Sequence, residues 1–256
     1  MKEKLLVLLV GQSNMSGRGY LTENDITPIP GIMAIRRDFQ WIPAVDPFNY
    51  DRLNMLGLSD AADPFEVQGL TLCGQKRCGV GPGRTFAKLL KARFPDAEIG
   101  LIPASIGGTP VAAWLPGGKD PNSEAHPYDD MLKLAREAMK FGRIVAVLWH
   151  QGETDARNHT ENYPEKLKTV LANIRRELNL PKTPFVLGGL GEFLQYGEEG
   201  PRYNAMIEAV AKELPDTGFA SAAGLVDRGD HLHFCTESQY ELGRRYWEEF
   251  RRLAHL

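Results

Sequence analysis

Short apolar runs alternate along the chain with longer amphipathic segments. Runs of four to six apolar residues between turn residues are typical of buried strands, and apolar residues spaced three and four apart are typical of helices that cover a sheet. This alternation predicts an α/β fold with a parallel sheet. The predicted strands are 5–10, 32–35, 98–103, 144–149 and 185–190, with a weaker sixth at 218–222, and the predicted helices are 84–94, 127–141, 163–178, 201–214 and 236–253.

The stretch 39–83 does not follow this alternation. It contains several prolines, several glycines and aromatic side chains. A loop of this length in a compact domain is usually functional or disordered, and its aromatic residues argue against disorder. We expect it to cover the carboxyl end of the sheet and to help shape a binding site. The alternative is an Ω-like loop that is packed for stability alone.

The first predicted strand leads directly into the polar segment 11–17, Gly-Gln-Ser-Asn-Met-Ser-Gly. Ser13 follows the carboxyl end of this buried strand, where open α/β sheets bind their ligands. A helix that begins here would bring its positive end to Ser13 and stabilise a developing anion. Ser13 is a candidate nucleophile, which needs a base to take its proton. The alternative is a serine that caps a helix.

A base is available near the other end of the chain, in Asp230-His231-Leu232-His233-Phe234. Asp230 and His233 are three residues apart, so both can face the same way in a turn. The carboxylate can then orient the imidazole, which can serve a serine brought near by the fold. The spacing alone does not choose between His231 and His233, and a helix cap is the alternative role for Asp230.

Further polar segments follow other predicted strands. In 149–155, Gln151 can donate an amide N–H to an oxyanion. Glu153 has several candidate roles in that segment: it can pair with His233, hold Gln151 or an arginine, or bind a substrate hydroxyl. The glycine-rich segment 78–84 lacks the spacing of a phosphate-binding loop, and 104–109 is best explained as a glycine turn.

Three of these segments together resemble the sequence blocks of SGNH-type hydrolases. Gly11–Met15, Trp149–Asp155 and Asp230–Phe234 stand in the order found in that family, and they are most similar to its sialate O-acetylesterase-like branch, which includes the acetylxylan esterases of carbohydrate esterase family six. The resemblance implies a three-layer α/β/α sandwich with a central five-stranded parallel sheet, similar to flavodoxin. It also implies a serine esterase that removes acetyl groups from sugar hydroxyls without a metal or other cofactor.

The resemblance also assigns roles to individual residues. It implies that Ser13 is the nucleophile, His233 the base and Asp230 the third member of the triad. The segment 149–155 carries Gln151 where the wider family has an asparagine, which is typical of the sialate-esterase-like branch and leaves Glu153 as a second candidate for the acid. The implied oxyanion donors are the N–H groups of Ser13 and Gly81 and the amide of Gln151.

Composition narrows the range of partners. A chain of 256 residues can form one domain, here 1–256. A net charge of -3 gives no reason to expect nucleic acid or an anionic membrane surface as a partner. We expect an acetylated carbohydrate to be the substrate. A homo-oligomer is also compatible with the sequence. Trp114 is our candidate for a ring that stacks on the sugar.

The cysteines and the N-terminal segment indicate the cellular compartment in which we expect the protein. Cys73 and Cys78 can close a small loop by a disulfide, but free thiols in a reducing compartment are the simpler interpretation. No Cys/His cluster has the spacing of a zinc site. The apolar run after Lys4 is read as a strand rather than a signal peptide, so we expect a cytoplasmic protein.

Two other functions stay open. One is a broad carboxylesterase that acts on small esters without preference for sugars. The other is a carbohydrate- or nucleotide-binding protein that has the same fold and no catalytic activity.

Overall fold

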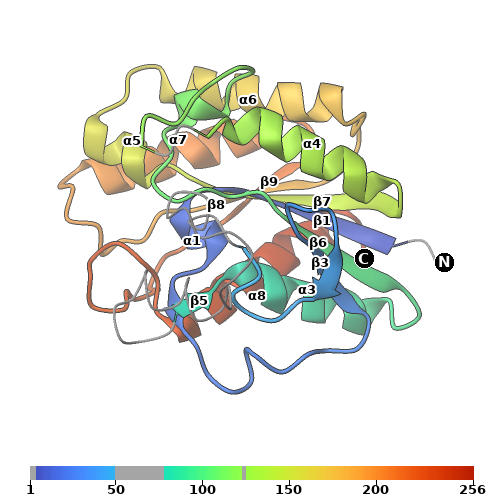
Figure 1. Ribbon diagram of the computed structural model, residues 1–256. Helices are drawn as coiled ribbons and strands as arrows, with labels where there is room; N and C mark the ends of the chain where they lie inside the picture. The colour runs from blue at the N-terminus through green and yellow to red at the C-terminus, as the bar shows by residue number, and fades with distance from the viewer. Residues whose placement is uncertain (1–3, 50–77, 123–124) are drawn as a thin grey trace.

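A twisted sheet with helices on both faces forms the centre of the molecule (Figure 1). The computed structural model describes residues 4–49, 78–122 and 125–256. Neighbouring strands of the sheet are parallel except β3 and β4, which form an antiparallel hairpin. In order across the sheet, the strands are β4 (Trp41–Pro43), β3 (Ile32–Ile35), β6 (Glu98–Pro103), β1 (Lys4–Gly11), β7 (Gly142–His150), β8 (Phe185–Gly188) and β9 (Thr217–Ala220).

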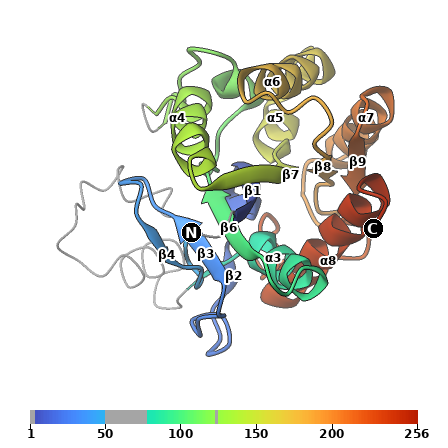
Figure 2. The ribbon, with the colours of Figure 1, turned by 90° about the vertical axis from the view of Figure 1, so that its right-hand side faces the viewer.

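The helices form the two outer layers. Figure 2 shows the helices grouped on the two faces of the sheet, with α3 and α8 packed side by side. One face carries α4 (Pro127–Met139), α5 (Glu153–Asn158), α6 (Tyr163–Glu177) and α7 (Glu199–Glu213), and the other carries α3 (Pro82–Arg93) and α8 (Thr236–Leu253). The shorter elements are α1 (Ser13–Ser16), the 3-10 helix η2 (Val111–Trp114), and β2 (Gly19–Tyr20) with β5 (Cys78–Val80), which pair as a separate ribbon.

Strand β1 lies inside the sheet and is buried on both faces. Leu6, Leu8 and Val10 pack into the hydrophobic cluster under α4, α6 and α7. Val7 and Leu9 pack into the second cluster, under α3 and α8. An uninterrupted apolar run is what a parallel strand with helices on both sides requires.

The predicted three-layer α/β fold is confirmed, but in the described residues the sheet has seven strands and not five. The weakly predicted sixth strand is present as β9. The seventh, β4, lies in the stretch that was expected to be a loop. The chain turns at Phe39, whose φ is 68°, and returns along β3 as an antiparallel strand. Much of the rest of that stretch, including residues 50–77, lies outside the described residues.

The sheet brings three segments to one edge. The N–H of Gln12 donates to the carbonyl of His150 at 2.8 Å, and the N–H of Ile106 donates to the carbonyl of Gly11 at 2.9 Å. At Gly11, φ is +128° and a Cβ would lie 2.0 Å from the His150 carbonyl oxygen. Only glycine allows this close approach. The segments that follow β1, β6 and β7 therefore meet beside Ser13.

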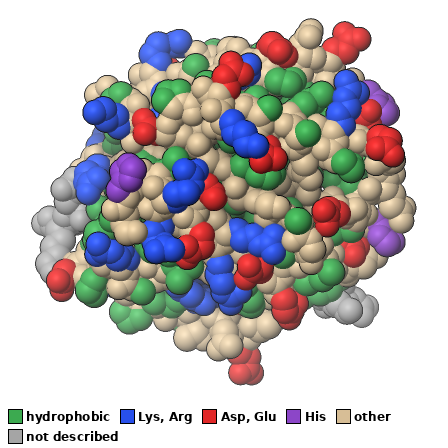
Figure 3. Space-filling model, turned by 180° about the vertical axis from the view of Figure 1, so that it is seen from behind, with side chains coloured by type: hydrophobic (Ala, Val, Ile, Leu, Met, Phe, Trp, Pro, Cys, Tyr) green, Lys and Arg blue, Asp and Glu red, His purple; other side chains and the backbone are tan. Residues whose placement is uncertain are grey.

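The surface shows no segregation of charge on the face seen from behind. Basic and acidic side chains are interspersed over it (Figure 3), in keeping with a net charge of -3. Within the described ranges, no helix is long and apolar enough to cross a membrane.

Candidate active site

Ser13, His233 and Asp230 lie in a chain of short contacts. The Oγ of Ser13 is 3.1 Å from Nε2 of His233, and Nδ1 of His233 is 2.7 Å from Oδ2 of Asp230. The serine and histidine are 220 residues apart in the sequence. This geometry is that of a nucleophile, its base and the carboxylate that orients the base.

A tight turn explains the three-residue spacing between Asp230 and His233. Oδ1 of Asp230 accepts the backbone N–H groups of Leu232 at 3.0 Å and His233 at 2.8 Å, as aspartate does in an Asx turn. His231 is in the left-handed region with φ of 53°, and its exposed ring lies beside Asp227, 3.7 Å from the carboxylate. Of the two histidines, His233 is the one that faces Ser13.

Burial and neighbouring charges set the protonation of His233 and Asp230. Burial opposes ionisation of Asp230, but hydrogen bonds from His233 and Arg228 outweigh it and hold the pKa of Asp230 well below its usual range. Burial lowers the pKa of His233; its hydrogen bond to Asp230 opposes this, while the charges of Arg18 and Arg228 add to the lowering. A neutral imidazole beside an ionised carboxylate is the state that a general base needs.

Ser13 lines a hollow of about 310 Å³, and three arginine side chains give this hollow positive charge. Arg228 donates to Asp230 at 2.7 Å and to the carbonyl of Arg18 at 2.9 Å. Arg157 is exposed and has no acidic partner among the residues that the structure describes. The lining residues are Gln12, Ser13, Arg18, Gly108, Glu153, Thr154, Arg157, Tyr196, Arg228, Leu232 and His233.

Two of the predicted oxyanion donors, Gln151 and Gly81, do not lie in the hollow, and these two predictions are corrected here. Gln151 is fully buried, and its amide donates to Asp155 and to the carbonyl of Thr109. Gly81 precedes α3, and a Cβ on it would meet the backbone of Met15 and Gly17. Neither residue lines the hollow. Both residues pack beside the hollow without lining it.

Other N–H groups in the hollow have no protein acceptor. The backbone N–H groups of Ser13 and Gly108 donate to no other group in the described part of the chain. Oε1 of Gln12 accepts the backbone N–H groups of Gly152 and Thr154, each at 3.4 Å. The amide of Gln151 also donates to this oxygen at 3.4 Å. The three donors fix the oxygen of the Gln12 amide, so its NH₂ group points the other way, and Gln12 lines the hollow.

Glu153 lines the hollow but does not contact His233. Its Oε1 accepts a hydrogen bond from Asn14 at 2.6 Å and lies 3.2 Å from Nε2 of His150. Burial opposes ionisation of Glu153, but the charge of His150 and the Asn14 bond outweigh it and lower the pKa of Glu153. Of the roles expected from the sequence, the structure shows neither the pairing with His233 nor a bond to Gln151.

Trp114 is not an exposed stacking platform, and this prediction was wrong. The ring is fully buried, donates its N–H to Thr109 Oγ1 at 3.0 Å, and packs edge-on against Trp149. The aromatic ring in the hollow is Tyr196, which is half-buried. Tyr196 follows β8 at the same edge of the sheet, so the strand-end rule that identified Ser13 could also have identified it.

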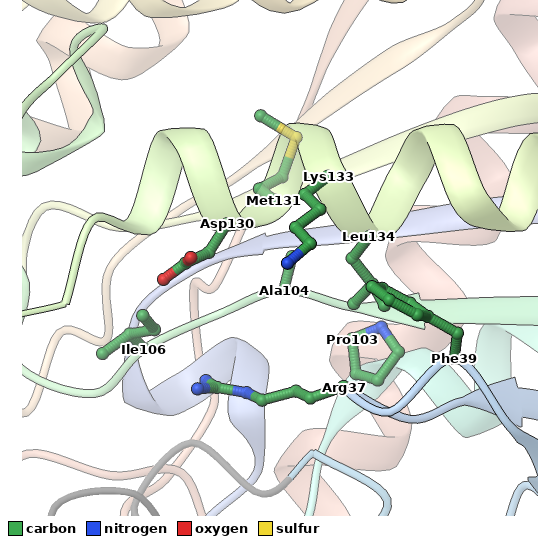
Figure 4. A pocket seen from close by; sticks show the side chains of 9 residues that line it. All are labelled: Arg37, Phe39, Pro103, Ala104, Ile106, Asp130, Met131, Lys133 and Leu134. Atoms are coloured by element: carbon green, nitrogen blue, oxygen red, sulfur yellow. The ribbon is translucent and has the colours of Figure 1, made fainter.

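A second hollow, of about 190 Å³, lies between α4 and the end of β6 (Figure 4). Arg37, Asp130 and Lys133 lie around apolar side chains there, and Lys133 Nζ lies 5.6 Å from the centre of the Phe39 ring. None of the predicted catalytic residues lines it. The contacts among Ser13, His233 and Asp230, and not the shape of the surface, therefore locate the candidate site.

Among the described residues, no group of three or more His, Cys, Asp or Glu side chains could hold a metal ion. Cys235 is a free thiol. The predicted choice between a disulfide and free thiols for Cys73 and Cys78 falls on side chains outside the described part.

Comparisons with known proteins agree with the sequence blocks. The family model described as carbohydrate esterase, sialic acid-specific acetylesterase, matches residues 3–252. A probable carbohydrate esterase of Arabidopsis thaliana is 30% identical over an alignment of 258 positions, which covers 93% of this chain and 86% of that protein. The structure of the Arabidopsis protein has a TM-score of 0.73 at 28% identity, with 98% of each chain covered.

Two more distant structures share the fold. NanS has a TM-score of 0.75 at 17% identity, with 99% of this chain and 98% of NanS covered. A carbohydrate acetylesterase from Xanthomonas citri has a TM-score of 0.64 at 18% identity, with 98% of this chain and 56% of that chain covered.

Proposed function

Because the chain belongs to the sialic acid-specific acetylesterase family of carbohydrate esterases, we propose that it removes acetyl groups from a carbohydrate with Ser13 as the nucleophile. The family makes it a carboxylic ester hydrolase that acts on acetyl esters of carbohydrates. The observation that carries the serine mechanism is the unbroken chain of contacts from Ser13 through His233 to Asp230.

The reaction proceeds in two halves. Ser13 Oγ attacks the acetyl carbonyl carbon while Nε2 of His233 takes the hydroxyl proton. The tetrahedral intermediate collapses, and His233 gives the proton to the leaving sugar oxygen. Water then attacks the acetyl-enzyme, with His233 again taking a proton and returning it to Ser13. Acetate is released, and Asp230 stabilises the imidazolium in both halves.

The oxyanion is stabilised by N–H groups that have no protein acceptor. We assign this role to the backbone N–H groups of Ser13 and Gly108 and to the amide of Gln12, in place of Gly81 and Gln151. Such donors stabilise the negative charge that develops on the carbonyl oxygen. Replacing one of them typically costs about 10²–10³ in kcat.

The charge of the hollow favours a carbohydrate that carries a carboxylate. Arg18, Arg157 and Arg228 line it together, and Arg157 is exposed and has no acidic partner in the described structure. Guanidinium groups bind carboxylates by paired hydrogen bonds. An O-acetylated sialic acid has this charge and a neutral acetylated xylan does not, so we favour the sugar acid.

The first test is acetate release by the wild type and by Ser13→Ala. The substrates are a chromogenic acetate ester, an O-acetylated sialic acid and acetylated xylan. We expect the wild type to cleave the ester and the sialic acid, and Ser13→Ala to be inactive on both. Cleavage of the small ester alone would indicate the broad carboxylesterase, and an inactive wild type would indicate a binding protein.

A further inference from the structure

The side chain of Asn14, the residue after the nucleophile, holds the loop that carries the base. Its Nδ2 donates to the carbonyl of Leu232 at 3.2 Å, and its Oδ1 accepts the N–H of Phe234 at 3.2 Å. These two backbone groups flank His233 on either side. Asn14 is fully buried, and its bond to the Phe234 N–H is buried with it.

A buried carboxylate, Glu153, in turn holds Asn14 and lies against His150. The second proton of its amide goes to Oε1 of Glu153 at 2.6 Å, and Nε2 of His150 lies 3.2 Å from the same oxygen. Glu153 and His150 are at most 1% exposed. A buried carboxylate is costly unless it is paired and hydrogen-bonded. The Asn14 amide and Nε2 of His150 both lie against Oε1, whereas Oε2 of Glu153 has no hydrogen-bond partner among the described residues.

Tyr246 fixes the orientation of His150. The Tyr246 hydroxyl donates its single proton to the carbonyl of Trp149 at 2.9 Å, so it accepts from Nδ1 of His150, 3.1 Å away. Nε2 of His150 is thereby aimed at Glu153. The His150 ring also packs edge-on against Phe234, with ring centres 5.6 Å apart.

We propose that Glu153 is a positioning residue, which together with His150 holds Asn14 so that Asn14 fixes His233 against Ser13. The proposal rests on the function proposed above and assigns Glu153 a role other than that of triad acid. Asp230 already takes Nδ1 of His233 at 2.7 Å. Misplacement of a catalytic group by about 1 Å can cost 10²-fold in rate. The contacts that link Glu153 through Asn14 to the His233 loop should therefore affect the rate of catalysis.

A double-mutant cycle tests whether Glu153 affects kcat through Asn14. Asn14→Ala should lower kcat about 10²-fold with little change in KM, and Glu153→Gln should lower it about tenfold because the glutamine oxygen still accepts from Asn14. The double variant should be no slower than Asn14→Ala, because Glu153 acts through Asn14. Effects that multiply would show that Glu153 acts on substrate or His233 directly and would overturn the proposal.

A conservative rescue separates positioning from general destabilisation. Glu153→Ala removes the acceptor and should lose about 10²-fold in kcat, while Glu153→Gln regains part of it. Equal losses in the two variants would contradict the proposal. If Asn14→Ala does not fold, as judged by thermal unfolding, Asn14→Ser takes its place in the cycle.

Hydrogen exchange at the Phe234 amide tests the link from Glu153 through Asn14 to the His233 loop, without any assay of activity. Asn14→Ala and Glu153→Ala should both speed exchange at Phe234 and leave it unchanged at Leu148 in the centre of β7. Asp155→Asn is the matched control, because Asp155 is a buried carboxylate on the same helix that holds Val111 and Gln151 instead of Asn14. Unchanged exchange at Phe234 in Glu153→Ala would overturn the proposed link between Glu153 and the His233 loop. An inactive wild type with the expected exchange would refute only the proposed esterase function.

Discussion

His233 has two kinds of charged neighbour, and they act on its proton in opposite directions. Asp230 favours the imidazolium, whereas burial and the charges of Arg18 and Arg228 disfavour it, and the net effect lowers the pKa of His233. The resting enzyme therefore holds an unprotonated base over a wider acidic range than an ordinary histidine would allow.

The lowered pKa of His233 predicts where activity falls on acidification. Protonated His233 cannot accept the Ser13 proton, so kcat/KM falls as the pH drops through the pKa of His233. Since that pKa is lowered, the midpoint should lie below the ordinary value of 6.5. The measurement is kcat/KM against pH on a neutral chromogenic ester, whose own charge does not change. A midpoint at or above 6.5 would contradict the direction.

Arg157 should determine preference for a charged sugar. Arg157→Gln removes an exposed cation from the hollow, and we expect KM for an O-acetylated sialic acid to rise about three- to tenfold. KM for a neutral acetate ester should not change. Arg93→Gln is the control, because Arg93 is an exposed cation in the last turn of α3 and does not line the hollow. Equal effects on both substrates would refute a carboxylate contact.

At the scale of single elements, long strands buried on both faces could be predicted and short or irregular elements could not. The run 5–10 marks β1 because both of its faces need apolar residues. Helix α5 is only six residues long and lies between Gly152 at φ of 144° and the left-handed His159, so it shows no helical periodicity. Trp114 was misplaced because its burial depends on Trp149, which is distant in the sequence.

Gly11 should be essential to the junction of β1 and β7. In Gly11→Ala the new Cβ would lie 2.0 Å from the His150 carbonyl oxygen at φ of +128°. We expect a loss of about 3 kcal/mol in the free energy of unfolding, measured by urea titration. Gly117→Ala is the control, with φ of +71° and nothing within 4 Å of its Cβ; it should lose about 1 kcal/mol. Equal losses would mean that the close approach adds nothing to the backbone strain.

At the scale of the whole molecule, the sequence blocks and the parallel sheet together located the site. The strand-end rule and the Asp230–His233 spacing predicted residues that the fold brings within hydrogen-bond distance. The oxyanion donors could not be predicted in the same way. Whether Gln12 or Gln151 turns its amide toward the hollow depends on neighbours such as Thr154 and Asp155, which only the assembled sheet brings into contact.

The proposed mechanism uses only side chains and backbone groups of this chain. Dialysis against EDTA should leave kcat on the chromogenic ester unchanged, because Ser13 and His233 supply the nucleophile and the base. The measurement compares dialysed enzyme with enzyme to which zinc or calcium has been returned. A loss on dialysis that a metal restores would refute the mechanism.

The sheet order determines when in synthesis the site can form. Strand β1 pairs with β6 and β7, whose first paired residues are Glu98 and Gly142, and the histidine lies 220 residues after the serine. A growing chain therefore presents β1 at the ribosome long before either neighbour exists, and its apolar residues must be protected until both have emerged. Even then Ser13 has no base. In the proposed mechanism, esterase activity can begin only when the ribosome has released the segment that carries His233.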